Sequence, residues 1–181
     1  MEAAAKFLKR IGPEELERCL FAETLALAGG CAGGQLWVGA SPAPYSRDGR
    51  RVHSCLLVRA ESRGELGGVP FRSTLTGYVS MRLETLEQEQ HESLELGAHP
   101  IERRTRMVQH PRGMTVTVST REGKAEPQSR EFSHGWASLG GLLGEAAGLL
   151  LLRVLARRRA VPPGLVFPAI DSEGHLGTTT Y

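Results

Sequence analysis

The sequence predicts an α+β domain in which a mainly antiparallel, strongly curved β-sheet packs against one long helix in the C-terminal half. Apolar and polar residues alternate in successive short segments between residues 19 and 134, which is typical of half-buried strands. Clusters of glycine and proline separate these segments, as turns between strands require. One apolar stripe at helical spacing then follows, between residues 138 and 159.

The first residues predict two short helical turns, Glu2–Arg10 and Pro13–Arg18. Pro13 suits the first position of a helix, and the acidic Glu14 and Glu15 complement the positive end of the helix dipole. A chain of 181 residues has the length of one domain with a flank. We therefore expect an N-terminal helical segment over residues 1–18 and a β-rich domain over residues 19–181.

The first strands are predicted from turn signals as much as from alternation. Cys19–Ala28 and Gln35–Val38 flank a glycine-rich stretch, which predicts a hairpin. Pro42–Gly49 reads as a loop, and Val52–Ala60 as a strand buried on both faces around residues 55–58. A turn with three glycines over Gly64–Pro70 then leads into an alternating strand over residues 74–84.

Residues 85–96 allow two interpretations. As a helix, the segment would place Leu83, Leu86, Gln90 and Leu94 on one face. As a strand, it would place Leu86, Leu94 and Leu96 on the face opposite several glutamates. We favour the strand because strands are predicted on both sides.

Two further hairpins are expected. Ile101–His110 and Met114–Arg121 surround a turn at residues 111–113, and residues 129–134 return to the sheet. Leu165–Ile170 and His175–Tyr181 form a last hairpin around a turn at residues 171–174. Because the sequence ends in a predicted strand, we expect the domain to be truncated at its C-terminal end.

The helix over residues 138–159 has Ser138 as its expected N-cap and three arginines at its C-terminal end. Gly140, Gly144 and Gly148 have the spacing of small residues in membrane helix dimers. However, the apolar run is short and contains two charges, each of which costs roughly 2.5–3.5 kcal/mol in the middle of a membrane. We therefore expect no transmembrane span and assign the glycines to close packing of the helix on the sheet.

No pattern of catalytic or cofactor-binding residues is present, so we expect no enzyme, no catalytic residue, no cofactor and no metal. The two aspartates, Asp48 and Asp171, both fall in predicted turns, and the glutamates at 84–95 read as a solvated face. The six histidines have no metal-ligand spacing, although His53 and Cys55 would share one face of a strand. The glycine-rich stretch at 29–34 lacks the Gly-Lys-Ser/Thr of a phosphate-binding loop.

Charge and cysteine content favour an intracellular protein that does not bind nucleic acid. The formal net charge is only +2, and few aromatic residues accompany the basic clusters at 103–106 and 157–159. The three cysteines (Cys19, Cys31 and Cys55) form no Cys-x-x-Cys pair, which indicates a reducing, cytoplasmic setting.

Four segments together resemble one family: PEELERCLFAETLAL (13–27), SCLLVRAESRGELGGVPFRSTLTGYVSMRLETLEQEQHESLEL (54–96), RRTRMVQ (103–109) and LLLLRVLARRRAVP (149–162). The sequence resembles the ciliogenesis-associated, tetratricopeptide-repeat-interacting protein family (CATIP). The resemblance covers most of the chain, and its motifs are structural rather than catalytic.

The resemblance implies a non-enzymatic scaffold or adaptor that binds a tetratricopeptide-repeat partner, promotes actin polymerisation and supports cilium assembly. It implies a location in the cytoplasm and cytoskeleton near the cilium, at the periphery of the plasma membrane and in the nucleus. The alternative is a curved β cradle that binds an apolar ligand or lipid, with the leucine-rich helix lining it.

Overall fold

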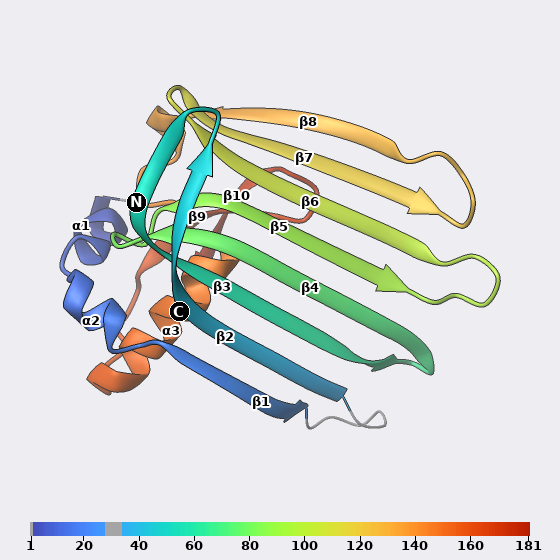
Figure 1. Ribbon diagram of the computed structural model, residues 1–181, viewed down its shortest axis with the longest axis horizontal. Coiled ribbons are helices and arrows are strands. Elements are labelled where there is room, and N and C mark those ends of the chain that lie inside the picture. The colour runs from blue at the N-terminus through green and yellow to red at the C-terminus, as the bar shows by residue number, and fades with distance from the viewer. Residues whose placement is uncertain (1, 28–33) are drawn as a thin grey trace.

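A computed structural model describes residues 2–27 and 34–181, and eight of its strands form one antiparallel sheet in chain order (Figure 1). These strands are β1 (Phe21–Leu27), β2 (Gly34–Arg47), β3 (Arg50–Leu66), β4 (Val69–Ser80), β5 (Thr85–Leu94), β6 (Ile101–His110), β7 (Gly113–Glu122) and β8 (Gln128–Gly135). Among the described residues the edge strands β1 and β8 do not pair with each other, so the sheet is open. The expected antiparallel sheet is confirmed.

Two short helices precede the sheet, α1 (Glu2–Leu8) and α2 (Pro13–Glu17). Pro13 lies in the first turn of α2, where a missing backbone N–H is not needed by the helix. Leu16 is fully buried in the main core. The helices therefore pack on the β-rich part of the chain rather than extending from it.

The loop expected at Pro42–Gly49 is wrong, because β2 continues to Arg47. β1 pairs with β2 only as far as Ala40, so Pro42 lies where β2 has a single neighbour, β3. Proline is tolerated in a strand at such an open edge because no ladder hydrogen bond is required of its nitrogen. Just after Pro42, the pairing of β2 with β3 shifts register between Ala43 and Tyr45, as at a β-bulge.

The strand interpretation of residues 85–96 is confirmed by β5, but its predicted face is wrong in part. Tyr78 pairs with Glu87 and Val79 pairs with Thr85, so Leu86 is an extra residue in a bulge. The bulge turns Leu86 onto the opposite face from Leu94, where it packs in a small buried cluster with Tyr45 and Cys55.

The long helix begins at Glu145, not at Ser138, and runs to Arg158 as α3. Leu139 and Leu143 are both buried but in two different core clusters, which a regular helix with its four-residue repeat would not allow. A short 3₁₀ turn (Trp136–Ser138) precedes Leu139, and Gly141, at φ +78°, lies in the turn between Leu139 and Leu143. The Ser138 hydroxyl donates to the Gly135 carbonyl (2.9 Å) instead of capping the helix.

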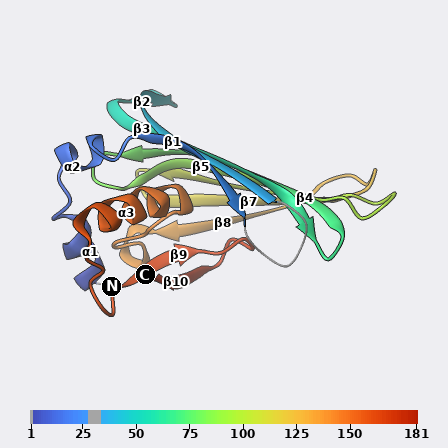
Figure 2. The same ribbon diagram turned by 90° about the horizontal axis from the view of Figure 1, so that it is seen from below.

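Helix α3 lies on one face of the sheet, across β3, β4 and β5 (Figure 2). Leu150 and Val154 are fully buried there with Val58, Val79 and Phe167. The last two strands, β9 (Val166–Ile170) and β10 (Leu176–Thr180), form the expected hairpin and lie on the same side of the sheet. No helix in the described part of the chain has both the length and the apolarity needed to cross a membrane.

The predicted close packing of the three glycines on the sheet holds for Gly144, whereas Gly148 packs closely on Tyr181, outside the eight-stranded sheet. A Cβ at Gly144 would stand 2.4 Å from Oγ1 of Thr85, and one at Gly148 would stand 2.4 Å from the hydroxyl oxygen of Tyr181. Gly140, which precedes the helix, has no atom within 4 Å of such a Cβ.

Candidate interaction site

The histidine and cysteine residues that could bind a metal do not assemble into a site among the described residues. Within residues 2–27 and 34–181, His, Cys, Asp and Glu side chains form no group of three with metal-binding geometry. His53 is exposed, whereas Cys55 is buried and its thiol donates to the Ala43 carbonyl (2.9 Å). Burial raises the pKa of the Cys55 thiol. Cys31 and the glycines at 29, 30 and 33 lie outside the described residues.

The acidic and basic clusters, which the sequence left as separate surface features, pair with each other across β5 and β6. The register places Glu87 and Glu89 beside Arg106 and Arg104 on one face, and Glu92 beside Arg103 on the other. The acidic stretch is therefore not a freely solvated face. Cross-strand ion pairs of this kind stabilise the alignment of two strands.

Glu87 is the centre of the most buried of these pairs. Its carboxylate accepts hydrogen bonds from the Arg106 guanidinium (2.7 Å), from Arg47 (2.9 Å) and from the Tyr45 hydroxyl (3.2 Å), and its side chain is only 16% exposed. Burial favours a higher pKa for Glu87, but the bonds from Arg106 and Arg47 outweigh it and lower the pKa. Burial and the neighbouring Glu87 raise the pKa of Tyr45 to about 12. This cluster joins β2, β5 and β6.

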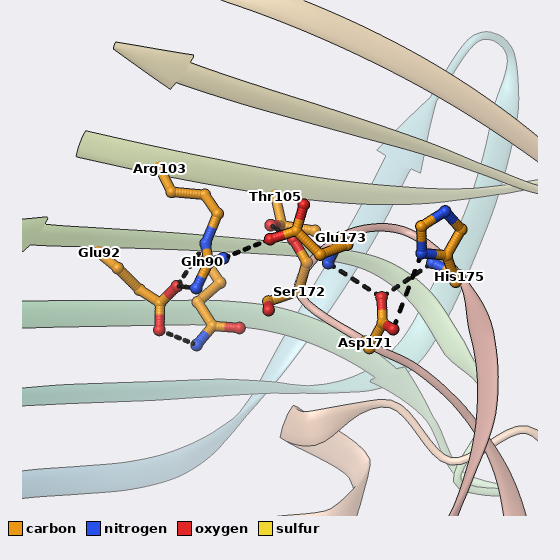
Figure 3. Close-up of polar contacts among 8 residues, drawn as sticks. All are labelled: Gln90, Glu92, Arg103, Thr105, Asp171, Ser172, Glu173 and His175. Carbon is orange, nitrogen blue, oxygen red and sulfur yellow. Dashed lines mark hydrogen bonds and ion pairs between the residues drawn. The ribbon is translucent and has the colours of Figure 1, made fainter. Parts of the chain in front are cut away.

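A second polar cluster attaches the turn between β9 and β10 to the sheet (Figure 3). Arg103 donates to Glu92 (2.9 Å) and to Glu173 of the turn (2.8 Å). The Asp171 carboxylate accepts the backbone N–H groups of Glu173 and His175, both at 2.9 Å, and the bond from His175 contributes most to lowering the pKa of Asp171. Every member has a partner, so the cluster is a structural clamp.

An open groove of about 640 Å³ lies at the end of the sheet next to α1. Its walls come from three places: the α1–α2 segment, the turn between β4 and β5, and the segment from Trp136 to Leu142. A second groove of about 510 Å³ shares Glu84, Gln109 and Trp136 with the first. The two grooves therefore form one depression, which we call the Trp136 groove.

The Trp136 groove has an apolar floor and a basic rim. Leu83, Met114 and Leu139 are buried beneath it. Trp136 is 42% exposed at the junction, and its indole N–H already donates to the Pro111 carbonyl (2.9 Å), so its ring has only apolar surface left to offer. The cations that line the groove are Lys9, Arg82, Arg50 and Arg47, and the carboxylates are Asp48 and Glu84.

Little in the sequence indicates this groove. Trp136 stands just before the helix predicted over residues 138–159, and the other lining residues of the first groove are dispersed between positions 5 and 142. The one local signal is a large aromatic residue that follows Gly135 at the end of a strand rather than within an alternating pattern. Only the tertiary arrangement places Trp136 and α1 on the lining of one groove.

Comparison with known proteins gives one consistent result. The family model described as "Ciliogenesis-associated TTC17-interacting protein, N-terminal domain" matches residues 3–181. Proteins named "Ciliogenesis-associated TTC17-interacting protein" are similar to the chain at 41% identity in Xenopus laevis and 36% in Homo sapiens, each over 98% of this chain. The alignments cover 47% and 46% of those relatives, so the chain spans about half their length. No solved structure matches it.

Proposed function

Because the chain belongs to the ciliogenesis-associated TTC17-interacting protein family, we propose that it is a non-enzymatic adaptor in cilium assembly that binds TTC17 directly. The observation behind this proposal is that the family model covers residues 3–181, which include the whole sheet and all the lining residues of the Trp136 groove. An exposed aromatic residue beside an apolar depression is typical of protein-binding surfaces.

Support for a non-enzymatic role comes from the polar clusters. The Glu87 and Arg103 clusters consist of ion pairs and hydrogen bonds that hold strands and turns together. The alternative, a cradle for an apolar ligand, would use the sheet face that α3 and Phe167 occupy, and so gains no support from the packing.

We also propose, from the family resemblance, that the protein acts on actin polymerisation. We place it in the cytoplasm and cytoskeleton near the cilium, with further sites at the periphery of the plasma membrane and in the nucleus. Because the matched relatives are about twice as long as this chain, each of these activities has to be tested with residues 1–181 and with a full-length relative side by side.

The decisive experiment measures direct binding of purified residues 1–181 to purified TTC17 by biolayer interferometry. We expect saturable binding, with the full-length human relative as the positive control. Binding of the full-length relative but not of residues 1–181 would contradict the proposal and assign the TTC17 contact to the rest of the relative. A pyrene-actin polymerisation assay with the same two proteins tests the actin proposal separately.

A further inference from the structure

We propose that the Trp136 groove binds an acidic amphipathic helix, which in the cell is a helix of TTC17. The identification of TTC17 rests on the proposed function, whereas the chemistry of the occupant follows from the groove itself. Three features define that chemistry: the backbone groups of the walls are already hydrogen-bonded, the rim carries cations that are unpaired among the described residues, and apolar residues lie where the two grooves join.

The walls offer no row of free backbone groups to an extended segment. The N–H groups of Lys9 and Ile11 bond to carbonyls of α1, that of Leu83 bonds to Ser80, and those of Leu139 and Leu142 bond within their own turn. A segment that adds to a sheet edge obtains main-chain hydrogen bonds from it, but this groove offers contacts through side chains. A helix suits such a groove because its backbone groups are already paired. Tetratricopeptide repeats are built from pairs of helices.

The charge of the rim selects an acidic helix. Among the described residues, Lys9, Arg82 and Arg50 have no carboxylate within ion-pair distance, and all three are exposed. Arg47 nearby is already neutralised by Glu87 and Asp48. Glu84 adds a negative charge to the same rim, and its carboxylate accepts a hydrogen bond from the Ser80 hydroxyl (3.3 Å). Carboxylates flanking the apolar stripe of a partner helix would complement these cations.

The junction of the grooves supplies the apolar anchor. Trp136 presents its ring, with its one polar group satisfied, and the partly exposed Met81 lines the same groove. Methionine side chains are flexible and polarisable, so they adapt to the apolar side chains of an incoming helix. Tryptophan is enriched among the residues that contribute most to binding at protein interfaces.

The edge of β1 is the surface that would compete for an extended segment. Its charged residue, Glu23, is ion-paired with Arg153 (2.6 Å), whereas the other edge strand, β8, carries several charges. Charges protect an edge strand from pairing with other chains, so β1 is the less protected edge. Binding of TTC17 through β1 rather than through the groove is therefore the alternative that the experiments must detect.

Chemical cross-linking locates the partner's carboxylates. A carbodiimide joins lysine amines directly to carboxylates, and the chain has three lysines: Lys9 on the groove, Lys6 on α1, and Lys124 in the turn between β7 and β8 at the other end of the sheet (Figure 1). With purified TTC17 bound, we expect Lys9 to be joined to an Asp or Glu in a TTC17 helix. Cross-linking of Lys124 without Lys9, or protection of β1 amides but not of the groove in hydrogen exchange, would overturn the proposal.

Substitutions then measure each contribution. The double variant Lys9→Glu with Arg82→Glu should raise the Kd for TTC17 at least about tenfold, because each exposed cation becomes a repelling charge. Lys124→Glu should leave the Kd unchanged. Trp136→Ala should weaken binding by a similar factor. Leu152→Ala is the control, because it removes a similarly exposed apolar side chain that lies on α3, away from the lining of the groove, and it should leave the Kd unchanged. Equal affinities for the groove variants and their controls would overturn the proposal.

A peptide experiment separates failure of the groove from failure of the proposed function. The probe is a fluorescein-labelled, 18-residue helix-forming peptide with leucine at i, i+3 and i+4 positions and glutamate on both flanks, compared with the same peptide carrying lysine. We expect the acidic peptide alone to bind, to lose affinity with added salt, and to fail on the double variant. If TTC17 does not bind but the acidic peptide does, the proposed function fails and the groove chemistry stands. Equal binding of both peptides, or of neither, overturns the inference.

Discussion

A Cβ atom added to Gly77 of β4 would stand 2.4 Å from the Cβ of Ala146 in α3, so sheet and helix meet at a separation that requires glycine in the strand. A hydrogen bond holds the two elements together at the same place. The backbone N–H of Ala146 donates to the side-chain oxygen of Gln88 (2.9 Å), a buried residue of β5. This contact fixes the height at which α3 lies over the sheet.

Gly77→Ala should therefore destabilise the domain. The added methyl group pushes α3 away from β4, and overpacking of this kind costs about 1–3 kcal/mol in the free energy of unfolding. Urea unfolding measures it. Gly140→Ala is the matched control, because no atom lies within 4 Å of its added Cβ, and it should change the free energy by less than about 0.5 kcal/mol. Equal effects of the two substitutions would show that the close contact does not limit packing.

Leu150→Arg should unfold the domain, whereas Leu152→Arg should be tolerated. Leu150 is fully buried against the sheet, and Leu152, two residues along α3, is 47% exposed. A buried and unpaired arginine costs several kcal/mol, which is comparable with the whole stability of a domain of roughly 5–15 kcal/mol. Near-ultraviolet circular dichroism in detergent-free buffer distinguishes the two outcomes. A folded Leu150→Arg variant, or wild-type protein that dissolves only in detergent, would contradict the assignment of α3 as a core helix.

Glu87→Gln should destabilise the domain at neutral pH by about 1–3 kcal/mol, because Arg47 and Arg106 lose a charged hydrogen-bond acceptor. The pKa of Glu87 is lower in the folded chain than its ordinary value of 4.5. Its contribution is therefore complete above about pH 4.5 and declines as the pH falls through the folded pKa.

The difference between wild type and Glu87→Gln should shrink accordingly when urea unfolding is repeated at successively lower pH. Glu126→Gln, at an exposed position in the turn between β7 and β8, is the control and should have little effect at any pH. A difference that stays constant down to the acid limit would mean that hydrogen-bond geometry, rather than the charge of Glu87, is responsible.

A chelator should leave the melting temperature of the domain unchanged. Folding that depends on a metal requires ligands brought together in space, and the described part of the chain contains no such group. Differential scanning fluorimetry with and without EDTA is the measurement. A lower melting temperature that zinc restores would refute the expectation.

The hairpins show how much of this fold the sequence determines alone. The segment predicted over Ile101–His110 matches β6 in both bounds, and the turn at residues 171–174 separates β9 from β10 as expected. Alternation and turn residues are local properties, since they depend on which side chains face inward and on which φ values a residue accepts. Neighbours in the sequence are therefore enough to predict such elements.

The features that matter for interaction depend on contacts between distant segments. Whether Pro42 ends a strand depends on where β1 stops, and where α3 begins depends on the two core clusters that receive Leu139 and Leu143. The register of β5 and β6 decides that Glu87 meets Arg106, and the path of the chain after β8 decides that Trp136 lines the same groove as α1. The sequence by itself determined that most of the chain forms an antiparallel series of strands, where the later hairpin turns lie, and the apolar stripe of the helix. The tertiary structure alone decided which edges are open, which charges are paired and where the groove lies, because these depend on the partner that each segment finds across the fold.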